Sequence, residues 1–352
     1  MRNTHGSSWN HVVAFTALGG QTIQPLNGSI LDGTRFPNAG ETRIAHIPHL
    51  PHMLSWGFRA PDYGSRYYKI RVQPKAHTPR GSKPRQYHGQ FIEDCKMRAF
   101  MDVLGVGKSA RSQSPWPIFI EMGALDGLRY SNSLAFEREG WRGILIEALG
   151  SNCEKLPMHR SSGQTINLCT AICTPPSGKP AGSLVFQMGG AATGHVVKST
   201  EKKTYRPDGS LKYKRITVPC SPLGALLRQL RIPRIDYFSL DVEGQEYEVF
   251  RTWNWSIPFT VLQFEWRKPM GTRLQSMLEE HNYVCIGKNG LDMVCIEETN
   301  HRKLLRYVKR NKGNISAVSS IKLFDEVVLA KQQSDSSYLC PVHPGLIAPL
   351  SV

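Results

Sequence analysis

The sequence predicts a doubly wound α/β domain over residues 86–300, built on a parallel sheet that ends in an antiparallel hairpin. Two observations predict this class. Short apolar runs that are typical of buried strands alternate with segments of helical periodicity. Several of these runs end in an acidic residue beside a turn, at the edge where sheets of this class bind ligands.

The most informative run is residues 117–127 (PIFIEMGALDG). An apolar stretch ends at Glu121, and Gly123 and Gly127 follow four residues apart. The pattern predicts a buried strand, a tight glycine loop that a ligand can approach closely, and a helix that begins near residues 131–133. Such a helix start suits anionic or polar ligand groups. The spacing differs from the dinucleotide fingerprint G-x-G-x-x-G, and a plain strand–turn–helix with packing glycines is the alternative.

A second apolar run, residues 141–147, also ends in an acid, Glu147. A carboxylate at the end of the second strand can accept hydrogen bonds from both hydroxyls of a ribose. Five acids are expected at the ends of four strands: Glu121, Glu147, Asp241, Glu243 and Glu265. This placement suits a cationic cofactor that carries a ribose.

The remaining elements follow from periodicity and turn signals. A helix is expected over residues 95–104, and a further helix begins at Ser221-Pro222, where a cap residue precedes proline. The Asn289-Gly290 pair predicts the turn of the terminal hairpin. The other expected elements are a strand over 165–172, an edge strand over 184–187, strands over 235–240 and 260–266, a helix over 274–282, hairpin strands over 283–286 and 293–296, and a basic helix over 301–312.

Residues 188–195 predict a flexible loop that could close over a substrate, and they contain His195. His195 is a candidate general base, although a histidine in a loop is more often simply solvated. The polar, basic residues 198–214 are expected to be an exposed excursion where an acidic substrate could dock.

The chain of 352 residues has 44 Lys and Arg against 28 Asp and Glu, a net charge of +16. Such charge favours acidic partners and leaves nucleic acid open, but solubility alone also explains it. Residues 1–85 have three acids against eleven Lys and Arg, and we expect an irregular, basic extension. Residues 301–352 are expected to form the basic helix and an irregular tail.

The eight cysteines include no CxxC pair, so a zinc site is not expected. Several lie in apolar runs, which favours buried free thiols and a reducing compartment. No apolar run is long enough to span a membrane, and the first residues fit a signal peptide poorly, so the expected location is intracellular. The sequons at Asn27, Asn254 and Asn314 have no meaning without secretion.

Four segments together resemble the FkbM-type methyltransferases: residues 120–127 (IEMGALDG), 131–133 (SNS), 140–147 (GWRGILIE) and 236–244 (DYFSLDVEG). The resemblance extends over about residues 86–297. It implies a Rossmann-like class I methyltransferase sheet, dependence on S-adenosylmethionine (SAM), and O-methylation of a hydroxyl on a sugar or related small molecule or glycan. Two positions depart from the family pattern: Ala148 replaces a frequent proline, and Thr170 replaces a small alanine.

The resemblance also implies roles for individual residues. Glu121, Gly123, Ala124 and Gly127 would line the methionine and ribose part of SAM, with Asp126 at the loop tip. Glu147 would hold the ribose diol, and Asp241 would face the methionine ammonium or the substrate. Ala171 and Ile172 would border the adenine. The candidate catalytic bases are Asp241, Glu243 and His195, and no metal ligands are predicted, although metal assistance stays open.

Three alternatives remain at this point. A nicotinamide oxidoreductase shares the fold but needs the missing glycine fingerprint. A nucleic-acid methyltransferase would explain the net charge and predicts salt-dependent RNA binding. A non-catalytic protein with the same fold would lack cofactor binding.

Overall fold

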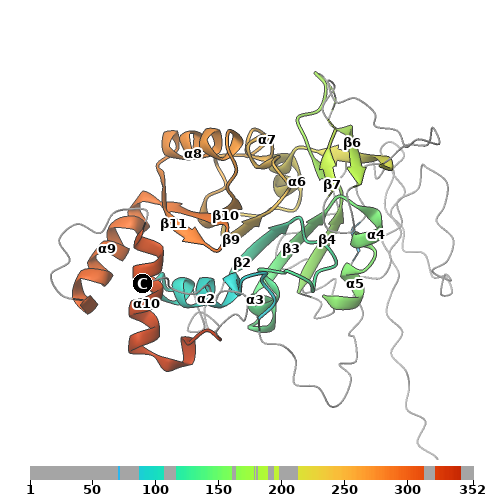
Figure 1. The fold of residues 1–352 in the computed structure, drawn as a ribbon. Helices are drawn as coiled ribbons and strands as arrows, with labels where there is room; N and C mark the ends of the chain where they lie inside the picture. The colour runs from blue at the N-terminus through green and yellow to red at the C-terminus, as the bar shows by residue number, and fades with distance from the viewer. Residues whose placement is uncertain are drawn as a thin grey trace, which may run out of the picture.

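The computed structural model describes residues 70–71, 87–106, 116–160, 164–177, 179, 181–188, 194–197, 213–312 and 322–341. Within them, an eight-stranded sheet is covered by helices on both faces, and a smaller four-stranded sheet lies beside one end (Figure 1). The predicted N-terminal extension lies outside the described residues except for residues 70–71, and most of the predicted excursion over 198–214 lies outside them too.

The large sheet has the doubly wound order that the sequence predicts. Its strands, in spatial order, are β1 (Ile70–Arg71), β4 (Thr165–Cys169), β3 (Arg142–Glu147), β2 (Ile118–Met122), β9 (Ile235–Leu240), β10 (Phe259–Glu265), β12 (Asp292–Glu297) and β11 (Tyr283–Asn289). The strands from β4 to β10 are parallel. The chain runs outward from β2 to β4 on one side and from β9 to β10 on the other, so the order reverses between β2 and β9. This reversal places a ligand crevice at their carboxyl ends.

The apolar residues of the central strands alternate between two cores because successive side chains point to opposite faces. Ile118 and Ile120 pack with α6 (Leu223–Gln229), α7 (Glu246–Phe250) and α8 (Met270–Glu280). Phe119, between them, packs on the other face. The elements of that second face are α2 (Glu93–Val103), α3 (Leu134–Arg138), α4 (Gly150–Cys153), α5 (Leu156–His159), α9 (Glu298–Lys312) and α10 (Leu323–Ser334). Figure 1 shows α6, α7 and α8 on one side of the sheet and α2, α3 and α10 on the other.

The antiparallel pair at the end of the sheet is present, but its position differs from a simple terminal hairpin. β12 lies between β10 and β11, and it pairs antiparallel with both. Gly290, in the turn between the two strands, has a φ of 67°. The chain then continues through α9 and α10, which pack against each other and against β11.

A second sheet was not expected from the sequence. It has the order β5 (Ala171–Ile172), β8 (Arg215–Ser221), β6 (Gly182–Met188), β7 (Gly194–Val196). The predicted strand over 165–172 is therefore wrong in extent, because it breaks at Thr170 and its last two residues pair with β8. The predicted edge strand over 184–187 belongs to β6, which lies between β8 and β7 in this sheet.

The prediction of buried free thiols is wrong. All eight cysteines form disulfides: Cys95–Cys340, Cys153–Cys169, Cys173–Cys220 and Cys285–Cys295. Six of the cysteines are buried and two, Cys169 and Cys340, are partly buried, but burial does not distinguish a thiol from a bridge. Cys95 and Cys340 are 245 residues apart in sequence, so no local spacing reveals their pairing. The inference of a reducing compartment loses its basis.

Among the helices that the structure describes, none combines the length and the apolar character needed to cross a membrane.

Candidate functional site

A pocket opens at the carboxyl ends of β2, β3 and β9, where the strand order reverses. Residues from both sheets line it. The large sheet and its loops contribute Gly123, Glu147 and Asp241, while the small sheet contributes Leu184 and Phe186. The small sheet therefore forms a wall of the crevice that the doubly wound order creates.

Gly123, at the end of β2, lies in close contact with the end of β9. Its φ is 79°, and a Cβ added to it would lie 1.8 Å from the carbonyl oxygen of Asp241. The Asp241 amide donates to the Met122 carbonyl at 3.0 Å, and the Gly123 amide donates to the Ile146 carbonyl at 3.0 Å. Only glycine fits this position, because any side chain would overlap the backbone of the neighbouring strand.

Glu121 lines the pocket, but protein groups occupy its carboxylate. Its Oε2 accepts hydrogen bonds from the hydroxyls of Ser131 at 2.8 Å and Ser133 at 2.6 Å, and from Arg160 at 3.2 Å. Its Oε1 accepts from the Asn132 amide at 2.7 Å. The start of α3, which the sequence predicts to favour an anionic ligand group, thus holds the protein's own carboxylate.

Arg160 is a central residue of this network that the sequence did not reveal. Its side chain is fully buried and pairs with Glu137 as well as Glu121. It also donates to the carbonyl of Gly127 at 3.3 Å and to the Ser133 hydroxyl at 2.9 Å. A buried guanidinium needs such partners. Through these hydrogen bonds, Arg160 holds the loop between β2 and α3 in place. No local sequence pattern marks a lone arginine for this position.

Glu147 is 6% exposed at the end of β3 and lines the pocket. Its Oε2 accepts from the Leu125 amide at 2.9 Å, and its Oε1 accepts from the Leu149 amide at 2.8 Å. Burial raises the pKa of this carboxyl to about 7, against the effect of these hydrogen bonds. A carboxylate has about four acceptor positions, so it can still accept hydrogen bonds from a ligand.

Three predicted loop residues are not among the described residues that line the pocket: Ala124, Asp126 and Gly127. Asp126 accepts hydrogen bonds from the amides of Leu128 at 3.0 Å and Arg129 at 2.8 Å. A Cβ on Gly127 would lie 2.8 Å from the Arg160 side chain. These three residues shape the loop, whereas the predicted residues Glu121, Gly123, Glu147, Ala171 and Ile172 all line the pocket.

Two of the three candidate bases line the pocket and one does not. Asp241 and Glu243 line the pocket, but His195 does not, although its neighbours Gly194 and Val196 do. His195 lies in β7 and pairs with Gln187 of β6. Alternation along the strand explains the difference, because adjacent side chains point to opposite faces.

Asp241 lies in an acidic cluster. One carboxylate oxygen from each of Asp241, Glu246 and Glu265 falls within 4.8 Å of the others, an arrangement that could hold a metal ion or another cation. Solvent reaches Asp241 through the pocket, yet protein surrounds it closely. Burial, followed by repulsion from Glu265 and other nearby acids, raises its pKa to about 8.

The charges of this cluster are only partly balanced within the described residues. Glu246 Oε1 accepts from the amides of Val242 at 3.2 Å and Gly244 at 3.1 Å. Arg267 pairs with Glu243 at 3.3 Å and with Glu265. The other oxygen of Glu265, Oε2, is buried without a hydrogen-bond partner. A cationic ligand is the chemical complement of this site.

Two residues that line the pocket, Arg129 and Tyr130, are not among those predicted from the sequence. Tyr130 is 43% exposed and has a left-handed φ of 60°, which is unusual for a non-glycine residue. The Arg129 guanidinium lies 4.7 Å from the centre of its ring and donates to its hydroxyl at 2.9 Å. An exposed aromatic directly after the glycine loop is the sequence signal that could have identified this part of the pocket.

A doubly wound α/β sheet with a pocket at its reversal point and acids at the strand ends belongs to the class that binds nucleoside-containing cofactors. The comparison with family models is more specific. Residues 121–285 match the methyltransferase FkbM domain. This match confirms the resemblance drawn from the sequence over that region, and it supports a methyltransferase in general. No curated protein was similar enough to give a match.

Proposed function

We propose that the protein depends on SAM and methylates a hydroxyl group of a sugar or a related small molecule or glycan. The observation that carries the cofactor assignment is the position of Glu147. Its carboxylate lies at the end of β3 on the pocket wall, with one backbone amide on each oxygen and a further hydrogen bond from the Asn152 side chain. Of about four acceptor positions, this leaves one for the ribose hydroxyls.

The pocket residues fit the remaining parts of SAM by their chemistry. Ala171 and Ile172 give an apolar border for the adenine. Gly123 keeps the floor free of side chains. The cluster around Asp241, with its unpartnered Glu265 oxygen, complements a sulfonium or an ammonium group. A metal ion is the other cation that suits these carboxylates.

When bound, SAM would supply a methyl group on a sulfonium sulfur for in-line displacement by an oxygen nucleophile. The protein's part is to align the two reactants, and alignment alone can supply much of the acceleration. Asp241 is our first candidate to accept the hydroxyl proton, because it lines the pocket and its pKa of about 8 suits a general base. Glu243 is less suitable because Arg267 pairs with it.

The walls of the pocket favour an uncharged acceptor. The acidic cluster would repel a phosphate or carboxylate placed beside it, while Leu184, Phe186 and the exposed ring of Tyr130 offer apolar surfaces. A sugar ring with free hydroxyls has both apolar faces and the required nucleophile. The net charge of +16 supports the alternative of a nucleic-acid acceptor, and a non-catalytic protein would retain the fold alone.

Calorimetry with SAM, S-adenosylhomocysteine and NADH tests the proposal on the wild type, Glu147→Ala and the matched control Glu154→Ala. Glu154 is an exposed acid on the same segment. We expect both adenosyl sulfur ligands to bind, Glu147→Ala to weaken them by roughly tenfold or more, and the control to have no effect. Binding of NADH alone would instead indicate an oxidoreductase. If none of the three bound, the non-catalytic alternative would replace ours.

A further inference from the structure

The four disulfides place a constraint on where this protein folds. They pair every cysteine in the chain and connect elements from α2 to the end of the described C-terminal segment. Structural disulfides form and persist in oxidising environments and are rare in the cytosol and nucleus. Eight paired cysteines with no thiol left over therefore favour an oxidising compartment.

A second feature is the outward face of α9, which carries exposed cations and no acid after its first turn. At 100° per residue, these cations fall within about 120° of the helix circumference. The buried side chains Leu304 and Val308 lie on the opposite face and join the core. The cationic face of α9 consists of Arg302, Lys303, Arg306, Lys309 and Arg310.

The cationic face lacks internal compensation. Among the described residues, none of the five forms an ion pair. Within the same part of the chain, the one side-chain hydrogen bond of the face is from Lys303 to the Asn300 side chain at 3.2 Å. Arg302, Arg306 and Arg310 follow one another at intervals of four residues, and like charges at this spacing destabilise a helix. A multivalent anion bound along the face would remove this repulsion.

The face is separate from the methyl-transfer pocket. Helix α9 packs against β11, β12 and α10 at one end of the large sheet. The small sheet, which forms one wall of the pocket, lies at the other end. Figure 1 shows α9 on one side of the molecule and β6 and β7 on the other. Binding at α9 would therefore leave the pocket open.

The compartment that the disulfides indicate favours one class of polyanion over the others. Nucleic acids belong mainly to compartments where disulfides are rare, and the anionic lipid surface of a membrane faces the cytoplasm. We propose that the cationic face of α9 binds an acidic polysaccharide in an oxidising compartment. The face is about 12 Å long, given 1.5 Å per residue over eight steps, and so presents several cations to a chain of repeated sulfates or carboxylates.

Two triple variants of the full chain test this proposal. Arg302→Ala/Arg306→Ala/Arg310→Ala removes three cations from the face. Lys155→Ala/Arg228→Ala/Arg273→Ala removes three exposed cations elsewhere and causes the same change in net charge. Alanine favours the helix, and thermal melts would check that both variants fold. Binding is measured for heparin as the sulfated probe, polygalacturonate as the carboxylated probe, poly(U) RNA, and vesicles that contain phosphatidylserine.

We expect the wild type to bind heparin or polygalacturonate in about 150 mM salt. The α9 variant should bind at least roughly fivefold more weakly with a smaller salt slope, and the control should change by less than about twofold. Equal weakening of both variants would mean that net charge alone is responsible and would overturn the proposal. Tighter binding of RNA or vesicles than of either polysaccharide would overturn the choice of partner.

Discussion

Gly123 and Asp241 lie at the ends of two adjacent parallel strands, and a Cβ on Gly123 would be only 1.8 Å from the Asp241 carbonyl oxygen. The two residues come from sequence positions more than a hundred apart, yet their backbones are in direct contact at the reversal point of the sheet. The glycine loop is therefore held against the strand end that carries the candidate base.

We expect Gly123→Ala to abolish cofactor binding and to destabilise the fold, because the added methyl group must push the β2 loop away from β9. The positive φ adds a further cost of about 1 kcal/mol. Gly140→Ala separates the two effects, since Gly140 also has a positive φ, 95°, but has no atoms within 4 Å of an added Cβ.

Chemical unfolding and calorimetry with SAM should then give different results for the two alanine variants. Gly140→Ala should lose only the stability that its positive φ costs, and it should keep its affinity for SAM. If Gly123→Ala bound SAM as tightly as Gly140→Ala, close contact with Asp241 would not be required at the site.

The affinity for SAM should depend on pH through Asp241. Its carboxyl has a pKa of about 8 without ligand, so most of it is protonated at pH 7. A cationic ligand prefers the ionised form, and the ionised fraction rises as pH increases through 8. We therefore expect tighter binding from pH 6 to 9, by up to about tenfold per pH unit below 8, with release of protons at pH 7.

Calorimetry in buffers of different ionisation enthalpy would count the released protons. Asp241→Asn should remove most of the pH slope, leaving the contribution of Glu147, whose pKa is about 7. Glu248, which is partly exposed and pairs with Arg251 at 2.9 Å, gives a control, and Glu248→Gln should leave the slope unchanged. A pH-independent affinity for the wild type would show that Asp241 does not face the cationic part of the ligand.

The stability of the ligand-free protein should fall as pH rises through the neutral range. Burial raises the pKa of Asp292 to about 7, although Gln263 donates to it at 2.6 Å. The folded state thus holds this proton more tightly than the unfolded state, for which the pKa is near 3.8. The contribution to stability is complete below pH 4 and is lost as pH rises to about 7, by up to roughly 4 kcal/mol.

Denaturant unfolding at pH 5, 6, 7 and 8 would measure this loss. Asp292→Asn keeps an oxygen that can accept the hydrogen bond from Gln263, and it should flatten the decline and be more stable than the wild type at pH 8. Asp325→Asn, on the exposed side of α10, is the control and should follow the wild type. An equal decline in Asp292→Asn would assign the pH dependence to other acids.

The central strands and the site acids were predictable because their signals are local. The apolar runs that became β2, β3 and β9 each end within a few residues of their acid, so Glu147 and Asp241 could be placed at one edge of the sheet. The same reasoning could not show that Glu121 is occupied by Arg160, because that contact joins residues 39 apart and depends on the folded loop.

Long-range pairing also explains the errors. Thr170 interrupts a run that reads as one strand, and only the pairing of β5 with β8 reveals that the chain has changed sheets there. The face on which His195 points depends on the pairing of β7 with β6. The burial of Cys285 and Cys295 was predictable, whereas oxidation state requires the distance between two cysteines, such as 5.6 Å between the Cα atoms of Cys173 and Cys220.

Protein isolated with immediate acid quenching and alkylation should take up no thiol reagent before reduction and eight equivalents after it, because all eight cysteines are paired. Intact-mass measurement reads this directly. Uptake of eight equivalents before reduction would show that the bridges do not form in the producing cell. That result would remove the argument for an oxidising compartment, while leaving the binding experiment on α9 informative by itself.

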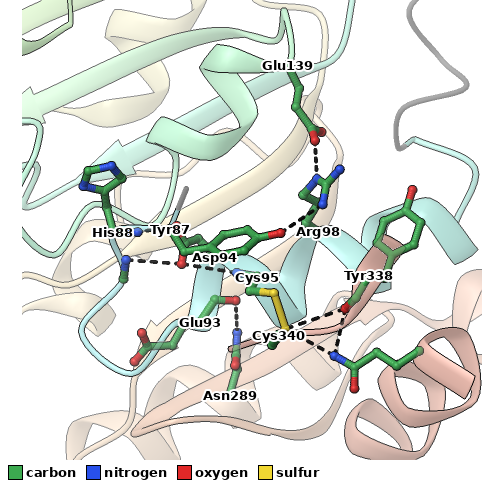
Figure 2. The surroundings of a disulfide bond; sticks show 12 residues. Tyr87, His88, Glu93, Asp94, Cys95, Arg98, Glu139, Asn289, Tyr338 and Cys340 are labelled. Carbon is green, nitrogen blue, oxygen red and sulfur yellow. Dashed lines mark hydrogen bonds and ion pairs between the residues drawn. A yellow bond between two sulfur atoms is a disulfide. The ribbon is translucent and has the colours of Figure 1, made fainter. Parts of the chain in front are cut away.

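The disulfide between Cys95 and Cys340 should contribute most to stability. It joins α2 to the segment after α10, where Gln332 donates to the Tyr338 carbonyl at 3.0 Å and the Arg98 guanidinium lies 5.1 Å from the Tyr338 ring centre (Figure 2). Closing a loop of 245 residues restricts the unfolded chain far more than closing one of ten residues. Cys95→Ala/Cys340→Ala should therefore cost about 3–5 kcal/mol.

The matched variant is Cys285→Ala/Cys295→Ala, which removes a bridge between two residues that are already register partners in a hairpin. It should cost about 2–3 kcal/mol. Guanidinium unfolding compares the two variants, and hydrogen exchange should show faster exchange in α10 only for the first. If the hairpin variant were the less stable of the two, restriction of the unfolded chain would not explain how these bridges stabilise the fold.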